Sequence, residues 1–373
     1  MHVVGSPHRS LRFEPPSIGA MSKFQALRLH QLGEPEEVLS LESLDPLLLG
    51  EGGVAIDVMA GALNFSDVLM CRGGYQVKPA LPFTPGVEVA GVVTRVGEGV
   101  ASDLVGERVL AVPDSGVGGF AEQTVARVSQ VFRIPEAMPF EDAAALHVTY
   151  QTSHLALHRR AAIQSGETLL VHAGAGGVGT AAIQLGIAAG ARVFATAGGK
   201  EKVDLCRSLG AELVIDYLSE DFVEVVNGAT VGRGADVIFD PVGGDTFDRS
   251  RKCIAFEGRL LVIGFTSGRI PEAPANHALV KNYSILGVHW GLYNTKNPAL
   301  VHEIHRSLIA LYEAGAIKPL ISEVVELLAV PTALGRLADR RTTGKIVWSR
   351  VIAPNNGHVQ EPVRQETPLS GNI

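Results

Sequence analysis

Cysteine is scarce in this chain of 373 residues, which contains only Cys71, Cys206 and Cys253. Three widely spaced cysteines cannot form a disulfide framework or the paired ligands of a zinc ribbon, and they favour a reducing compartment. Glycine, proline or charge interrupts every apolar run well before the length of a membrane span, and the first twenty residues lack the apolar core of a signal peptide. The sequence therefore predicts a cytoplasmic protein that does not associate with membranes.

Positive charge is also in deficit, with 32 Lys and Arg against 39 Asp and Glu and a net charge of −7. Without a basic excess, little drives binding to a phosphate backbone, so we expect no nucleic-acid partner. The apolar fraction of 46% and the charged fraction of 19% are those of an ordinary globular protein. A chain of this length has room for about two domains.

A glycine-rich segment follows the short apolar run Leu169–Val171, which is typical of a buried parallel strand. In such a dinucleotide-binding motif Gly174 permits the tight turn, Gly176 lets the backbone approach a pyrophosphate, and Gly179 lets helix and strand pack closely. Free N–H groups at the helix N-terminus would bind the phosphates. The loop residues predicted to contact the cofactor are Gly174, Ala175, Gly176, Gly177, Val178 and Gly179. The alternative is a glycine-rich turn in another α/β fold.

Strand and helix patterns alternate after this loop. A helical pattern from Val178 to Ala189 ends at Gly190, the usual position for a C-terminal glycine. Strand-like runs follow at Arg192–Thr196, Leu213–Asp216, Asp236–Phe239, Arg259–Ile263 and Ser284–Val288. Helical patterns between them include Lys200–Leu209 and Thr246–Phe256. This alternation predicts a doubly wound parallel sheet, a Rossmann domain over residues 148–285.

The flanking regions differ in character from this α/β segment. Residues 22–147 carry short β patterns rich in glycine and proline, which predict a partly open β-barrel. Residues 286–352 contain two further helices and two strands, and we expect this part to return to the first domain. Residues 1–21 and 353–373 are expected to be a flexible extension and a tail. The strand and helix patterns of the flanking regions are Val54–Val58, Val87–Val93, Arg108–Val112, Pro298–Ala314, Ser322–Glu326, Pro331–Arg341 and Lys345–Ser349.

The end of the second predicted strand indicates which nicotinamide cofactor binds. NAD-binding proteins usually place an acid there to hold the ribose hydroxyls. Here Gly199 is followed by Lys200 and Lys202, which can meet a 2′-phosphate. We therefore predict NADPH, with these three residues as contacts; the alternative is that both lysines lie on a solvated helix face. Tyr217, at the end of the third strand, is expected to cover the adenine or the phosphate, or to be an ordinary tyrosine at the sheet rim.

Several motifs together resemble the zinc-free quinone oxidoreductases of the medium-chain dehydrogenase/reductase superfamily, the ζ-crystallin-like group. The resemblance spans about residues 22 to 350 and implies a GroES-like substrate domain wrapped around a Rossmann domain, with the active cleft between them. The motifs are Asn64-Phe-Ser-Asp67, Arg72-Gly-Gly-Tyr75, Pro85–Val93 with Gly97, His172–Gly179, Lys281–Gly291 and Arg340–Lys345.

Comparison with the zinc-dependent relatives bears on metal binding. Those relatives carry a cysteine where Asn64 stands and a histidine where Val87 stands, and neither asparagine nor valine is a normal zinc ligand. We therefore predict no metal. Without a Lewis acid, alcohol oxidation is disfavoured. The resemblance implies hydride transfer from NADPH to a quinone or another conjugated carbonyl. The alternatives are an enoyl-thioester or 2-alkenal reductase and a non-catalytic, crystallin-like NADPH-binding protein.

The resemblance also assigns individual residues. Asn64 and Asp67 match positions that face the nicotinamide and its ribose, and Asn64 would also donate a hydrogen bond to a substrate oxygen. Tyr75 would line the substrate pocket and donate a proton, or else pack beneath a loop. The other positions matched to cofactor contacts are Thr149, Phe265, Thr266 and Lys345. The segment Tyr283–Trp290 implies a homodimer joined at a sheet edge; the alternative is a single edge strand covered by a loop.

Overall fold

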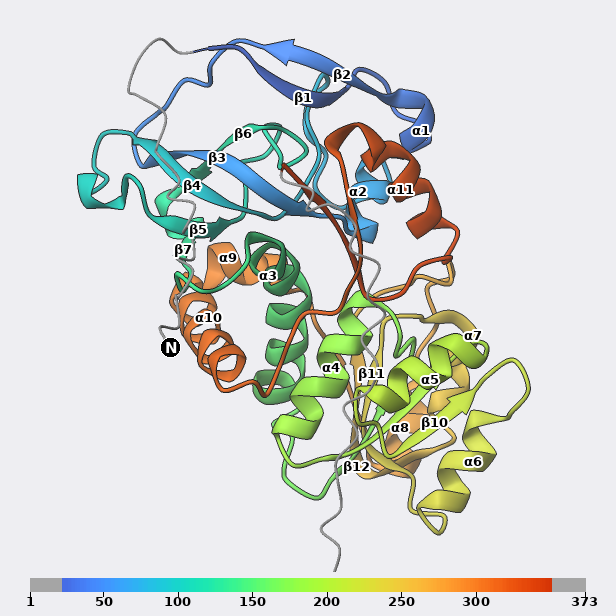
Figure 1. The fold of residues 1–373 in the computed structure, drawn as a ribbon. Coiled ribbons are helices and arrows are strands. Elements are labelled where there is room, and N and C mark those ends of the chain that lie inside the picture. The colour runs from blue at the N-terminus through green and yellow to red at the C-terminus, as the bar shows by residue number, and fades with distance from the viewer. Residues whose placement is uncertain (1–21, 351–373) are drawn as a thin grey trace, which may run out of the picture.

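A six-stranded sheet forms one lobe of the computed structural model, which describes residues 22–350 (Figure 1). All its pairings are parallel, in the order β10-β9-β8-β11-β12-β13. Counted from β8, this is the order 3-2-1-4-5-6 of the predicted doubly wound fold, and it reverses between β8 and β11. The strands are β8 (Thr168–Val171), β9 (Arg192–Ala197), β10 (Leu213–Asp216), β11 (Ala235–Asp240), β12 (Ile254–Val262) and β13 (Ser284–Gly287).

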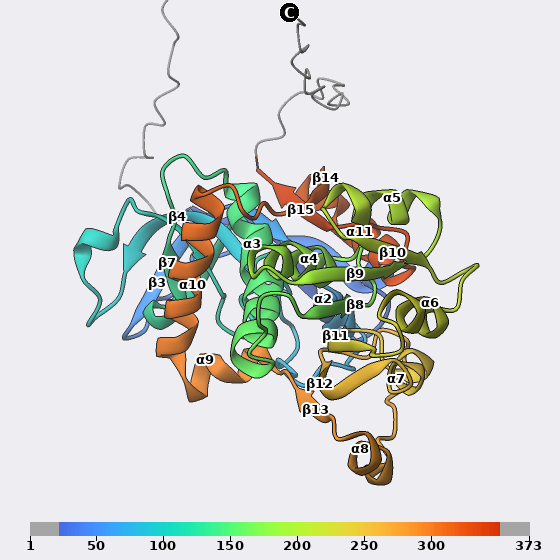
Figure 2. The same ribbon diagram turned by 90° about the horizontal axis from the view of Figure 1, so that it is seen from below.

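Helices cover both faces of this sheet, which explains why its central strands read as continuous apolar runs (Figures 1 and 2). The first of them leaves the glycine-rich loop and ends before Gly190, whose φ of 76° is the left-handed conformation predicted for that residue. The helices are α4 (Gly177–Ala188), α5 (Lys200–Ser208), α6 (Phe222–Ala229), α7 (Gly244–Ser250) and α8 (Ala275–Lys281).

The helix predicted over Thr246–Phe256 is wrong in its second half. Helix α7 ends at Ser250, and β12 already begins at Ile254. Ile254 pairs with Ala235 before a register shift, and the left-handed φ of 56° at Glu257 interrupts the strand. Because this irregularity breaks the alternation of side chains, the start of the strand resembles the continuation of a helix.

A seven-stranded sheet forms the second lobe, in the order β14-β15-β3-β4-β5-β7, with β6 paired to β3. The long strand β3 pairs with β6 through its first half and with β15 through its second half. This branching closes the sheet toward a barrel and joins the C-terminal strand β15 to it. A separate antiparallel pair, β1 and β2, lies beside it. The strands are β1 (Phe24–Leu29), β2 (Leu39–Leu44), β3 (Gly53–Ala62), β4 (Val89–Val96), β5 (Arg108–Ala111), β6 (Gln123–Arg127), β7 (Val131–Arg133), β14 (Ile321–Val325) and β15 (Lys345–Ser349).

Helix α3 connects the two lobes, because it packs on β3 and β4 of the barrel lobe and on α4 of the parallel-sheet lobe (Figure 2). The predicted domain boundary at 147/148 falls inside α3, and the boundary at 285/286 falls inside β13. The remaining helices are α1 (Pro35–Val38), α2 (Phe65–Cys71), α3 (Phe140–His154) with its π-helical extension (Leu155–Arg160), α9 (Tyr293–Lys296), α10 (Pro298–Glu313) and α11 (Val330–Ala338). Short 3₁₀ turns occupy Ser102–Leu104, Val128–Gln130, Trp290–Leu292 and Leu327–Ala329.

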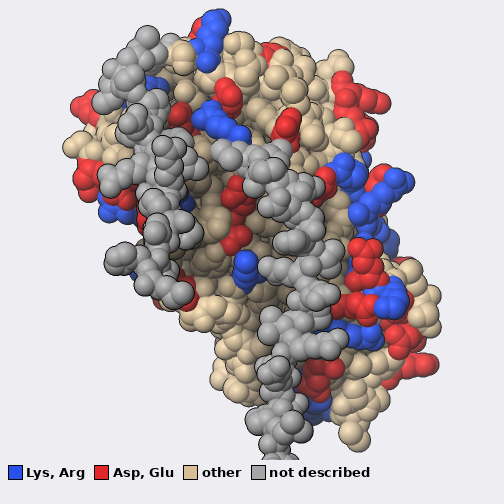
Figure 3. Space-filling model, viewed as in Figure 1, with Lys and Arg blue, Asp and Glu red and all other residues tan. Residues whose placement is uncertain are grey.

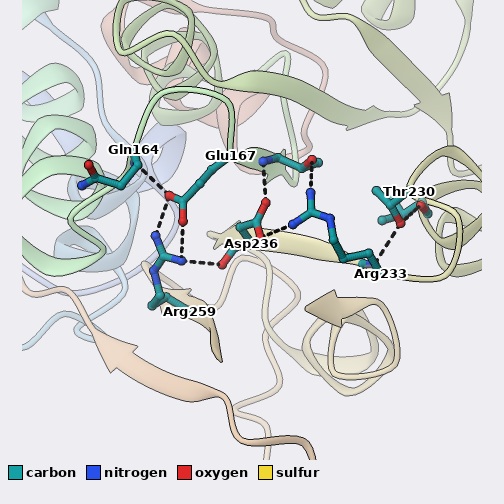
Figure 4. A network of polar contacts seen from close by, with 9 residues as sticks. Gln164, Glu167, Thr230, Arg233, Asp236 and Arg259 are labelled. Atoms are coloured by element: carbon teal, nitrogen blue, oxygen red, sulfur yellow. Dashed lines mark hydrogen bonds and ion pairs between the residues drawn. The ribbon is translucent and has the colours of Figure 1, made fainter. Parts of the chain in front are cut away.

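A polar network braces the amino ends of the parallel strands (Figure 4). Arg259 of β12 donates to both carboxylate oxygens of Glu167, at 2.9 and 2.7 Å, and to the carbonyl of Ala161 at 3.0 Å. Asp236 of β11 accepts from the backbone N–H that begins β8 at 2.7 Å and pairs with Arg233. We call Glu167, Arg233, Asp236 and Arg259 the amino-edge network.

Basic and acidic side chains are interspersed on the face of the molecule seen in Figure 3. Within residues 22–350, no helix has both the length and the apolar character needed to cross a bilayer.

Candidate functional site

A cavity of about 250 Å³ lies between the two lobes, at the carboxyl ends of the parallel strands. The loop residues Ala175, Gly176, Gly177 and Val178 form its floor, and Gly177 begins helix α4. A Cβ on Gly176 would meet only the carbonyl oxygen of Ala173, at 3.4 Å, so this part of the backbone is open to a ligand. The free N–H groups of the helix N-terminus therefore face a space suited to a pyrophosphate.

The other two glycines of the motif face away from the cavity. A Cβ on Gly174 would lie 3.0 Å from the Cβ of Ala195, and one on Gly179 would lie 2.2 Å from the carbonyl oxygen of Ala173. The second distance is far below contact, so the absence of a side chain at Gly179 lets helix α4 lie directly against the turn at Ala173 and Gly174, whereas the prediction places it against the strand. The left-handed residue of the turn is Ala173, with a φ of 50°, so Gly174 is required for close packing against β9 rather than for its backbone conformation.

Cationic side chains gather at one end of the cavity. Lys202 and Arg340 both line it, and Lys202 Nζ donates to the carbonyl of Arg340 at 2.8 Å. Tyr217 lines the same end, 53% exposed, with its hydroxyl beside Gly198. Strand β9 ends here at Ala197 without an acid, which leaves the space between these groups suited to a phosphate.

Lys200 does not lie at the cationic end of the cavity. Its side chain is 89% exposed and pairs with Asp204 on the solvent side of α5. Gly199, which precedes α5, has a φ of 83° and donates its N–H to Asp216 at 3.0 Å. Sequence reasoning missed Arg340, although it begins the motif Arg340–Lys345, because only the last residue of that motif is matched to a cofactor contact.

The other end of the cavity is bordered by Asn64, Thr149 and Lys345. Thr266 lies between the two ends, where its carbonyl accepts from the guanidinium of Arg340 at 2.5 Å. The hydroxyl of Thr149 donates within its own helix, to Ala145 at 3.0 Å. Phe265, which is 38% exposed, is not among the residues that line this cavity.

Behind this end lies a buried polar group that we call the carboxyl-edge cluster, composed of Asn64, Asp67, Glu88 and Lys345. Lys345 Nζ donates to Asn64 Oδ1 at 2.6 Å, to Glu88 Oε1 at 2.9 Å and to the carbonyl of Leu63 at 2.8 Å. The other oxygen of Glu88 accepts from the backbone N–H of Val148 at 2.7 Å. The ammonium is thus paired with three oxygens, and only the rest of the Lys345 side chain is left to border the cavity.

The amide of Asn64 is committed in the same way. Its Nδ2 donates to Glu88 Oε1 at 2.8 Å and to the carbonyl of Ala62 at 3.2 Å, so both N–H groups point away from the cavity. The expectation that Asn64 donates to a substrate oxygen does not fit this geometry.

Asp67 lies behind the cavity wall and is fully buried. Its carboxylate accepts from the N–H of Asn64 at 2.8 Å, at the start of α2, and from the N–H of Gly86 at 3.2 Å. Burial raises the pKa of Asp67 to about 7, although these N–H groups and the Lys345 ammonium oppose the shift. The structure therefore gives Asp67 a positioning role behind Asn64, with no face of its side chain on the cavity.

Tyr75 packs against a small apolar cluster that includes Met70, Cys71 and Phe83, and it is not among the residues that line the cavity. This location favours the packing role over that of proton donor. Burial, followed by the nearby Asp67 carboxylate, raises the pKa of the Tyr75 phenol. Burial also raises the pKa of Cys71 to about 12, which keeps its thiol protonated.

Among residues 22–350, no group of three or more His, Cys, Asp or Glu side chains is arranged to hold a metal. The position that carries cysteine in the zinc-dependent relatives is occupied by Asn64, against the ammonium of Lys345. The absence of a metal remains a prediction.

Comparisons with known proteins agree with this architecture. Residues 50–136 match the alcohol dehydrogenase GroES-like domain, and residues 177–306 match the zinc-binding dehydrogenase model. The chain is 38% identical over 350 residues to quinone oxidoreductase-like protein 2 homolog of Nematostella vectensis, a match covering 92% of this chain and 94% of the relative. The chain belongs to the zinc-free quinone oxidoreductase family.

Solved structures of the quinone oxidoreductase family and its neighbours have the same fold. Escherichia coli quinone oxidoreductase in complex with NADPH superimposes with a TM-score of 0.81 at 29% identity, covering 87% of this chain and 99% of that one. CurK enoyl reductase superimposes with a TM-score of 0.79 at 28% identity, with the same coverage of 87% and 99%. The two neighbours have names that correspond to the two enzymatic alternatives.

Proposed function

We propose that this protein transfers a hydride from NADPH to a quinone or another conjugated carbonyl. The observation that carries the proposal is a single cavity with two different ends. Lys202 and Arg340 lie at one end, the open glycine loop forms the floor, and Asn64 borders the other end. A dinucleotide with a 2′-phosphate matches this sequence of cationic, anion-binding and neutral polar surfaces.

The chain's own residues would hold NADPH along the cavity. Lys202 and Arg340 would bind the 2′-phosphate, with Tyr217 beside the adenine. The N–H groups at the start of α4 would bind the pyrophosphate, while Thr149, Thr266 and Asn64 would contact the nicotinamide part. Bound NADPH supplies the hydride from C4 of its reduced ring.

A quinone needs little activation, because its conjugated ring is already electron-poor. The hydride brings two electrons and one hydrogen, and a proton from water completes the hydroquinone. Leu63 and Phe65 border the nicotinamide end of the cavity and would limit access of water to the transferred hydride. The side chains that line the cavity therefore act by holding NADPH and the quinone at the right distance from each other.

Steady-state rates test the proposal with 1,4-benzoquinone, 9,10-phenanthrenequinone, crotonyl-CoA and a 2-alkenal. We expect NADPH consumption with the quinones, and with NADPH preferred to NADH. Turnover of the thioester alone would instead assign an enoyl-thioester reductase, the candidate that the similarity to CurK enoyl reductase favours. Binding of NADPH without consumption by any acceptor would favour the non-catalytic alternative.

We further propose a homodimer that forms through β13, the edge strand of the parallel sheet (Figure 2). Next to this edge, helix α8 exposes Leu279 and Val280, at 77% and 79%. Sedimentation of the protein and of a Val280→Asp variant tests this, with a dimer expected for the former and a shift toward monomer for the latter. The three cysteines are free and buried, which supports the cytoplasm as its location.

A further inference from the structure

We propose that Lys345 is a positioning residue that fixes the Asn64 amide in one orientation and ties that amide to the cofactor-binding loop. The proposal rests on the proposed function, because it takes Asn64 to border the nicotinamide. Lys345 itself does not touch the reacting atoms in this assignment. It acts through the side chain that its ammonium holds.

The first part of the argument is the path of the chain around Lys345. The N–H of Gly344 donates to the carbonyl of Ala175 at 2.8 Å, so the residue before Lys345 is bonded to the glycine-rich loop. The Cδ of Lys345 lies 3.1 Å from the point where a Cβ on Gly177 would stand. Its Nζ reaches Leu63 and Asn64, which belong to the barrel lobe. The side chain thus begins and ends in the barrel lobe, and its middle lies against the glycine-rich loop of the parallel-sheet lobe.

The second part is the charge on each side of the Asn64 amide. The carbonyl oxygen faces the ammonium of Lys345 at 2.6 Å, and the NH₂ group faces Glu88 at 2.8 Å and the carbonyl of Ala62 at 3.2 Å. A flipped amide would put NH₂ against the ammonium and its oxygen against a carboxylate and a carbonyl. All three contacts would then be repulsive, so the opposite charges of Lys345 and Glu88 specify a single orientation.

The burial of Lys345 and Glu88 increases the energy difference between the two orientations of the Asn64 amide. The side chains of Lys345 and Glu88 are 5% and 0% exposed, so water can neither screen the charges nor replace a lost partner. With the amide held, both of its N–H groups stay turned to Glu88 and Ala62, and Asn64 presents no N–H donor to the cavity. Without the ammonium, the oxygen would lose its donor and the preference between the two orientations would weaken.

The test compares Lys345→Ala and Lys345→Met with the wild type and with Lys296→Met, the same chemical change at an exposed lysine of α9. We expect kcat with a quinone to fall about 100-fold in both Lys345 variants, the effect of a misplaced group at a reacting centre. The KM for NADPH should change much less, because the phosphate contacts lie at the far end. Lys296→Met should match the wild type. A kcat within twofold of wild type in Lys345→Met would overturn the proposal.

Rescue of kcat by propylammonium distinguishes a positioning role from a merely structural one. This amine has the same three carbons and ammonium group that Lys345→Ala removes. We expect it to raise the kcat of Lys345→Ala several-fold, while 1-propanol, of similar shape but uncharged, does not. The fluorescence of bound NADPH should change in this variant and return with propylammonium. If the wild type binds NADPH but reduces no acceptor, the proposed function fails, and this fluorescence signal still tests Lys345. Absence of any difference between the amine and the alcohol would contradict the proposal.

The double variant Lys345→Met with Glu88→Gln covers the case in which a single variant fails to fold. It removes both charges, so stability should recover. If the introduced amide keeps its oxygen toward the N–H of Val148, its NH₂ group faces Asn64 and favours the flipped orientation there. We therefore expect a folded protein with low kcat. Recovery of both stability and kcat would show that Lys345 only compensates the charge of Glu88, and would overturn the assignment.

Discussion

Two charged networks lie at opposite ends of the parallel sheet, and they differ in exposure and in redundancy. In the amino-edge network the side chains of Arg259 and Glu167 are 19% and 22% exposed (Figure 4). In the carboxyl-edge cluster those of Lys345 and Glu88 are 5% and 0% exposed. Arg259 forms a two-pronged contact with Glu167 and also reaches the carbonyls of Ala161 and Asp236. Because these side chains are partly exposed, a water molecule can replace any one of these contacts.

Within residues 22–350, the carboxyl-edge cluster has neither additional hydrogen-bond partners nor access to water. Each N–H of the Lys345 ammonium and of the Asn64 amide has one oxygen, and the pair is closed to solvent. Burying an ion pair in this way is a weak means of stabilising a fold, since desolvation offsets much of the attraction. The comparison indicates that the partly exposed amino-edge network braces strands, whereas the buried carboxyl-edge cluster specifies the orientation of a neutral side chain beside the cavity.

Removal of one acid from each network should separate these roles most strongly. Glu88→Ala leaves the Lys345 ammonium buried without its carboxylate, and we expect a cost of about 4 kcal/mol in the free energy of unfolding. Glu167→Ala leaves Arg259 within reach of water and should cost about 1.5 kcal/mol. Urea unfolding monitored by circular dichroism measures both. Equal costs would show that burial does not distinguish the two networks.

Asp67 gives the carboxyl-edge cluster a pH dependence that can be measured as stability. Its pKa is about 7 in the folded chain against an ordinary value of 3.8, so between these values the native state holds a proton that the unfolded chain releases. Binding of this proton stabilises the native state, and the effect is complete below about pH 4 and is lost as the pH rises to 7. The free energy of unfolding should therefore fall by about 3 kcal/mol between pH 4.5 and 7. In Asp67→Asn the fall in stability with rising pH should flatten by this amount.

The matched control for that measurement is Asp45→Asn, which removes one exposed carboxylate from the barrel lobe. The comparison of the two variants uses the slope of unfolding free energy against pH, so a constant loss of stability in Asp67→Asn does not affect it. A slope as steep in Asp67→Asn as in the control would mean that Asp67 is ionised across this range.

The parts of the fold that the sequence predicts are those that local patterns encode. The strand Leu169–Val171, the glycine loop and the helix after it are contiguous, and each is marked by a pattern of its own in the sequence. The C-terminal strand Lys345–Ser349 likewise has its predicted bounds. The helix over Thr246–Phe256 is wrong because a register shift in β12 removes the alternation on which strand prediction depends.

The carboxyl-edge cluster could not be derived in this way. Lys345 is separated from Asn64 by 281 positions and from Glu88 by 257, so no spacing in the sequence relates them. The resemblance places Asn64 and Lys345 at the site, but the direction of each polar group depends on contacts between segments that are far apart in the sequence. Lys200 and Lys202 show the same limit on a smaller scale, because two residues apart on a helix they point to different sides.

Arg340 and Arg259 allow the comparison to be tested on cofactor binding. We expect Arg340→Ala to raise the Kd for NADPH about tenfold, the loss of one charge-assisted phosphate contact, and to leave the Kd for NADH unchanged. Arg259→Ala should lower the stability and leave both constants unchanged, since the amino-edge network lies at the other end of the strands. Fluorescence titration of each dinucleotide measures the constants. An equal loss of NADPH and NADH affinity in Arg340→Ala would contradict contact with the 2′-phosphate.

The smallest effect is expected for Lys200, whose ion pair with Asp204 lies in solvent on α5. Exposed pairs of this kind contribute at most about 0.5 kcal/mol, so Lys200→Ala should unfold at nearly the wild-type urea concentration. Its Kd for NADPH should stay within about twofold of wild type, whereas Lys202→Ala, two residues away and on the cavity, should weaken binding about tenfold. A similar loss in both variants would mean that Lys200 turns from Asp204 toward the phosphate when NADPH binds, and that an exposed ion pair can belong to the site as fully as a buried one.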